Sequence, residues 1–128
     1  MKRVACVAVL AAAVIVGGRL VAQEKGKAKY PIKTIMEKAH KGGTNSLRNK
    51  VVNGKASKEE LDTLVELYEE LGKNTPPKGD KASWQKKTEA VLAAARKVKA
   101  DPNDRAARQT LSKATTCMAC HDVHREDE

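Results

Sequence analysis

Hydrophobic side chains recur at helical spacing in four stretches of this chain, and the sequence offers no strand candidate. The first stretch begins at Pro31 and ends at Asn53-Gly54. Gly42-Gly43 lies inside it, so the helix either kinks there or gives way to two short helices. The second stretch opens with Ser57-Lys58-Glu59-Glu60, a capping box that predicts a helix start, and repeats leucines at helical spacing as far as Leu71.

Two more helices are expected further along. Asp80 or Ser83 caps the third helix, which ends at Asp101-Pro102. The fourth helix then continues without a break through Met118. Four amphipathic helices with short connections predict an all-α fold, an antiparallel four-helix bundle over residues 31–128.

The first 22 residues have the features of a secretory signal peptide. Lys2 and Arg3 form a basic start, residues 4–16 form an apolar run, and a candidate cleavage site ends at Ala22. The run is too short to span a bilayer comfortably, so we expect cleavage, with an uncleaved anchor as the alternative. The mature chain then begins with a flexible leader, residues 23–30. It has no membrane span and lies in the periplasm or elsewhere outside the cytoplasm.

The motif Cys117-Met118-Ala119-Cys120-His121 reads Cys-x-x-Cys-His, the pattern by which haem is attached covalently in c-type cytochromes. Two thiols three positions apart on a helical turn can each add to one haem vinyl group. The adjoining histidine can then bind the iron from one side. We therefore expect one covalent haem c, held near the C-terminal helix by Cys117 and Cys120, with His121 as the proximal iron ligand. Export agrees with this expectation, because haem c is attached outside the cytoplasm in bacteria.

Three other roles for the motif are less favoured. A thioredoxin-like pair belongs beside a βαβ unit, and a plain disulfide leaves His121 unexplained. Zinc is the stronger alternative, because Cys117, Cys120, His121 and His124 are four nitrogen or sulfur donors. Four ligands crowded into so short a segment would strain a tetrahedral site, so haem is favoured over zinc.

The second axial ligand of the iron must come from upstream in the chain or from outside the protein. Met118 is held on the proximal side by its flanking cysteines, which leaves Met36 as the favoured distal ligand. His40 is the alternative, one turn later and about 40° further round the helix, toward the polar edge of the apolar stripe. An open iron site is the third reading. His124 is expected at the surface or beside the haem propionates.

Composition agrees with a buried cofactor and excludes one class of partner. Phenylalanine is absent, and Tyr30, Tyr68 and Trp84 are the chain's aromatic residues, so the core of a domain this small would be marginal without a large apolar group. The formal charge of +9 falls to +6 when the expected signal peptide, with three basic and no acidic residues, is removed. This charge favours an acidic partner or an anionic membrane surface. Nucleic acid is not expected, because stacking aromatics are scarce and the lysines are scattered among glutamates.

Taken together, these residues resemble the class II c-type cytochromes, that is, cytochrome c′ and its low-spin, methionine-ligated relatives. The resemblance covers most of residues 31–126. Three segments carry it: Ile35-Met36-Glu37-Lys38, Ser83-Trp84-Gln85, and the motif continued as Asp122-Val123-His124-Arg125, with an arginine four residues after the ligand. It implies a four-helix bundle and a distal methionine where Met36 falls. The chain departs from the family in His40, in Gly42-Gly43 and in its short helix connections.

The expected function is one-electron transfer outside the cytoplasm by a mono-haem cytochrome. It is not expected to be an enzyme, because both axial positions of the iron are filled and no catalytic constellation is visible. The alternative is a five-coordinate module that binds nitric oxide or carbon monoxide, with Met36 packed over the iron without bonding. A docking subunit of a larger respiratory complex is a third reading. The expected partners are redox proteins, acidic ones among them, and assembly into a homodimer is left open.

Overall fold

The computed structural model describes residues 26–126, so the expected signal peptide and the first part of the leader lie outside the described residues. The helices are α1 (Ile32–His40), α2 (Leu47–Val52), α3 (Lys58–Lys73), α4 (Lys81–Ala100), α5 (Arg105–Ala114) and α6 (Cys117–His124), with a short 3-10 helix, η1 (Gly43–Asn45). Residues 26–126 contain no strand, which confirms the all-α prediction. Within that range no helix combines the length and the apolar character that a membrane crossing needs.

The first predicted helix is two helices, α1 and α2. Gly42 and Gly43 have φ angles of 113° and 58°, a left-handed conformation that is open to glycine and costly for other residues. Beyond this turn the Ser46 hydroxyl accepts a hydrogen bond from the amide of Asn49 at 3.3 Å and caps α2. Of the two readings left open at Gly42-Gly43, the pair of short helices is therefore correct.

The starts of α3 and α4 follow local rules. The capping box at Ser57 is present in full, with the Glu60 amide donating to the serine hydroxyl and the Ser57 amide donating to the Glu60 carboxylate. At α4 the Asp80 carboxylate accepts a hydrogen bond from the Ser83 amide at 2.9 Å. Asp80 is therefore the N-cap of α4, and Ser83 lies within its first turn.

The fourth predicted helix is broken at Thr115-Thr116, so the prediction of one continuous helix through Met118 is wrong. The Thr115 hydroxyl donates to the Leu111 carbonyl at 2.7 Å, and the Thr116 hydroxyl donates to the Lys113 carbonyl at 2.9 Å. Side-chain bonds of this kind satisfy the carbonyls at a helix end and let the chain turn. α6 is therefore a separate helix, and Met118 within it is 60% exposed.

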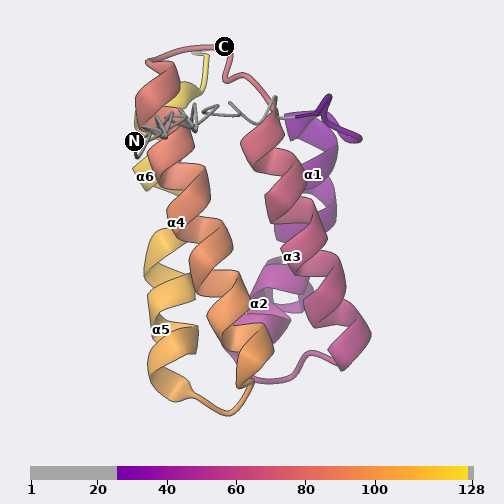
Figure 1. Cartoon of the computed structure of the whole chain (residues 1–128). Helices are drawn as coiled ribbons and strands as arrows, with labels where there is room; N and C mark the ends of the chain where they lie inside the picture. Colours follow the sequence, from indigo (N-terminus) through magenta and orange to yellow (C-terminus); the bar gives the residue numbers. More distant parts are fainter. Residues whose placement is uncertain (1–25, 127–128) are drawn as a thin grey trace, which may run out of the picture.

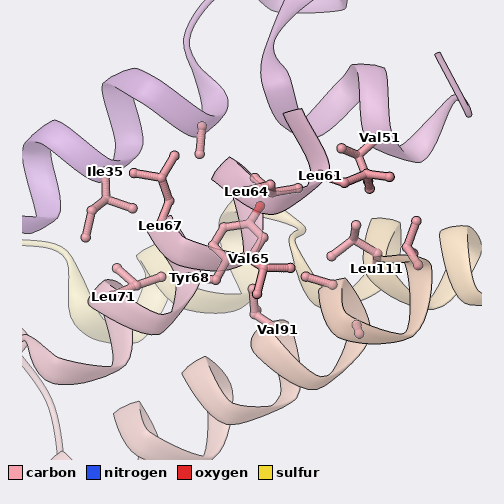
Figure 2. Packing of buried hydrophobic residues seen from close by; sticks show 14 of the residues in the cluster. Ile35, Val51, Leu61, Leu64, Val65, Leu67, Tyr68, Leu71, Val91 and Leu111 are labelled. Carbon is pink, nitrogen blue, oxygen red and sulfur yellow. The ribbon is translucent and has the colours of Figure 1, made fainter. Parts of the chain in front are cut away.

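The two longest helices, α3 and α4, lie side by side, as Figure 1 shows. Both α5 and α6 pack against α4, whereas α1 and α2 pack against α3, and α2 also packs against α5. The apolar cluster between these helices consists mostly of aliphatic side chains, and Figure 2 shows Tyr68 in its middle, next to Leu64 and Val65. Tyr68 is 1% exposed and is the largest of the fully buried side chains.

Candidate functional site

A cavity of about 830 Å³ lies between α1, α6 and the ends of α3 and α4 that face them. Close-packed protein interiors hold few voids larger than a water molecule, whereas small-molecule and cofactor sites measure about 300–1,000 Å³. Much of the lining is apolar: Ile32, Leu71, Trp84, Val91 and Ala114. All five residues singled out from the sequence also line it: Met36, His40, Cys117, Cys120 and His121. Segments from opposite ends of the chain are thus brought together around one space.

The α6 wall of the cavity carries the cysteine motif. Cys117 is exposed and Cys120 is half-buried, and neither forms a disulfide. Burial raises the pKa of the Cys120 thiol, and the nearby charge of Lys87 opposes this only in part. His121, next to Cys120, is half-buried and lines the same wall. Two free thiols and an imidazole are therefore the groups on α6 that could hold a cofactor.

The α1 wall carries Met36 and His40, which lie one helical turn apart and are both half-buried. Met36 packs against the apolar core. The Nε2 atom of His40 lies 3.3 Å from the Tyr68 hydroxyl, and the two ring centroids are 5.9 Å apart. His40, expected toward the polar edge of the helix, therefore lies in the cavity wall with a buried partner.

Burial sets the charge of His40. Desolvation, with smaller contributions from the positive charges of Arg48 and His121, lowers the pKa of His40 to about 4. Burial also raises the pKa of Tyr68, with the Arg48 charge opposing it. At neutral pH His40 is therefore uncharged, and the Tyr68 hydroxyl keeps its proton and can donate it to Nε2.

Arg48 is a residue of this region that sequence reasoning missed. Its Nε donates to the Thr115 hydroxyl at 2.8 Å, and one Nη donates to the Ser112 carbonyl at 2.9 Å. Arg48 thus ties α2 to the junction between α5 and α6 and places its charge near His40. Nothing in the sequence pattern distinguishes it from the other basic residues, because its partners lie more than sixty positions away.

Of the two positions expected for His124, the one at the surface is wrong. Its side chain is 3% exposed, with Nδ1 lying 3.0 Å from the Lys78 carbonyl and Nε2 lying 3.2 Å from the Ser83 hydroxyl. The Trp84 ring meets it edge-on, with centroids 5.3 Å apart. Both ring nitrogens are therefore engaged outside the cysteine motif.

Among residues 26–126 no three His, Cys, Asp or Glu side chains gather into a metal-ion site, so the zinc reading has no assembled ligand set there.

No protein-family model matches this chain, and no curated protein or solved structure is significantly similar to it. The resemblance to class II c-type cytochromes therefore remains an expectation from the three sequence segments named above. What the site can do follows from its own donors. These are two thiols and an imidazole on one wall of a largely apolar cavity, with a thioether and a second imidazole on another.

Proposed function

We propose that this protein is an exported mono-haem c-type cytochrome that transfers single electrons. The observation that carries the proposal is that Cys117, Cys120, His121 and Met36, from opposite ends of the sequence, line one cavity. In this proposal the fold is an antiparallel four-helix bundle. Its unbroken members are α3 and α4, and the other two are the interrupted pairs α1–α2 and α5–α6.

The proposed roles follow from the chemistry of each side chain. Cys117 and Cys120 hold the haem c through thioether bonds, and His121 binds the iron on the proximal side. When bound, the haem supplies a one-electron couple. Met36 is favoured as the distal ligand because the Nε2 atom of His40 is already hydrogen-bonded to Tyr68, whereas a thioether is a soft donor suited to haem iron.

The remaining lining supports the same role. Leu71, Trp84 and Val91 present apolar surface and exclude water, and a large flat group between them would fill the space that this aromatic-poor core leaves open. Lys33, Arg125 and Glu37 are exposed and also line the cavity, so its edge carries two positive charges and one negative charge. Complementary charge speeds the encounter of redox proteins, which supports an acidic partner.

Covalent attachment is tested first. The intact mass of the exported protein should exceed that of the mature polypeptide by one haem, and acid-acetone should fail to extract the haem. The double variant Cys117→Ala/Cys120→Ala should lose both properties, whereas His40→Ala, which alters the same cavity without touching a thiol, should keep them. Stoichiometric zinc without iron would contradict the proposal.

Met36 ligation is tested next. If Met36 binds, the ferric protein is low-spin with a near-infrared sulfur-to-iron band, and the ferrous protein resists carbon monoxide. Met36→Ala should open the site, lower the reduction potential and allow carbon monoxide to bind, whereas His40→Ala should leave the spectrum nearly unchanged. If His40→Ala alone produced high-spin iron, His40 and not Met36 would be the ligand.

A gas-binding module is the second candidate, and one observation favours it. His40 and the Tyr68 hydroxyl lie beside Met36 in the cavity wall, where they could hydrogen-bond a small ligand. In that case the wild-type protein is already high-spin and takes up carbon monoxide readily. The same spectra therefore decide between the two functions.

A further inference from the structure

The helix that carries the cysteine motif is attached to the rest of the fold at few points. Most of α6 is exposed, including Cys117, Met118 and Val123, and its one buried side chain is His124. A second attachment is made at the surface, where Lys87 of α4 donates to the Ala119 carbonyl. Since exposed contacts of this kind contribute little, the position of α6 depends mainly on His124.

The hydrogen bonds of His124 fix both the orientation and the tautomer of its ring. The Lys78 carbonyl can only accept, so Nδ1 carries the hydrogen and donates it over 3.0 Å. In the uncharged ring Nε2 is then the acceptor for the Ser83 hydroxyl, at 3.2 Å. One partner lies in the loop before α4 and the other in its first turn, so the imidazole bridges the end of α6 to both.

The contacts continue around one end of the cavity. Trp84, edge-on to His124, donates from Nε1 to the Asn74 carbonyl at 2.9 Å, and the Asn74 side chain donates to the Tyr30 carbonyl at 2.9 Å. His124 therefore connects α6 with the start of α4, the end of α3 and the segment that leads into α1. Figure 1 shows α6 beside the first turns of α4, at the same end of the molecule as the loop between α3 and α4.

We propose that His124 is a positioning residue for the site on α6: its two hydrogen bonds hold this helix against the loop before α4, so that Cys120 and His121 face the cavity. A residue here must be buried enough to anchor the helix and polar enough to satisfy a loop carbonyl. An imidazole meets both needs. The consequence for haem attachment rests on the proposed function, whereas the anchoring of α6 does not.

Amide hydrogen exchange, followed by mass spectrometry on the full chain as purified, tests the anchoring. His124→Phe keeps an aromatic ring beside Trp84 and removes both hydrogen bonds. Exchange in α6 should therefore rise roughly thirtyfold, as expected for the loss of two neutral bonds. His124→Asn can still donate to the Lys78 carbonyl and should restore part of the protection. The matched control is Val123→Thr, which replaces the neighbouring exposed side chain by one of similar size. It should leave exchange in α6 unchanged.

The pattern of exchange separates positioning from general stabilisation. Faster exchange confined to α6, with α3 as the internal reference, is the expected result. Unchanged exchange in α6 of His124→Phe, or an equal rise in α3 and α6, would overturn the proposal.

Intact mass on the same samples gives the fraction of chains that carry covalent haem. This fraction should fall in His124→Phe and recover in His124→Asn, and an unchanged fraction would refute the consequence for attachment. Wild-type protein without haem would refute the proposed function, and the exchange result for His124 would still decide the anchoring.

Discussion

Substitution of Gly79 by alanine probes a close approach between α6 and the loop before α4. Gly79 has a φ angle of +87°, and a Cβ built there would lie 2.6 Å from the Val123 carbonyl oxygen and 2.7 Å from Nδ1 of His124. The backbone conformation alone costs about 1–2 kcal/mol for a residue with a Cβ. The overlap with a backbone oxygen and a hydrogen-bonded ring adds about 1–3 kcal/mol. We therefore expect Gly79→Ala to lower the free energy of unfolding by about 2–5 kcal/mol.

Gly43→Ala is the matched control for this variant. Gly43 also has a positive φ angle, +58°, but a Cβ there meets nothing within 4 Å. It should therefore cost only the conformational part, about 1–2 kcal/mol. Urea unfolding followed by circular dichroism measures both variants against the wild-type protein. Equal loss of stability in the two variants would refute the reasoning, because the contact with α6 would then contribute nothing.

Three further outcomes are expected. Arg48→Met should lower the free energy of unfolding by about 1.5–3 kcal/mol in urea titrations. Arg48→Lys should not restore it, because a lysine cannot keep both bonds of the guanidinium. Full stability in either variant would contradict this. His40 has a pKa of about 4 in the fold and 6.5 as its ordinary value, so the unfolded chain binds more protons between these pH values. The contribution of uncharged His40 to the free energy of unfolding is thus complete above about pH 6.5, and up to about 3 kcal/mol of it is lost as the pH falls to 4. In urea titrations across that range, the free energy of unfolding of His40→Gln should lack this dependence on pH. In the haem-free chain expressed without residues 1–22, an alkylating reagent should modify Cys117 faster than Cys120, because Cys120 is half-buried and burial raises its pKa. Peptide mass spectrometry measures the two rates, and equal rates would contradict the described position of α6.

Local signals in the sequence were enough to predict most helix starts. The capping box at Ser57, the cap at Asp80 and the glycine pair Gly42-Gly43 act through neighbours within a few positions, so their effect can be predicted without knowing the fold. Met36 was favoured from the sequence because Met118 is held by its flanking cysteines, and Met36 and the cysteine motif line one cavity.

Features that depend on distant partners could not be predicted in this way. His124 is buried because Lys78 and Ser83, more than forty positions earlier, offer its ring a carbonyl and a hydroxyl. Nothing within a few positions of His124 in the sequence indicates these partners. The break at Thr115 was missed for a related reason. Threonine is tolerated within helices, and only its bonds to Leu111 and to Arg48 show that the helix ends there.

Trp84 is the one tryptophan of the chain, and it stands in the wall of the cavity. Its indole emission is therefore an intrinsic optical reporter of whatever fills that space. A strongly absorbing group seated there would quench the emission by energy transfer, and unfolding would restore it as the indole moves away. Fluorescence at tryptophan wavelengths thus follows both occupancy and unfolding without any added label, on amounts of protein too small for calorimetry.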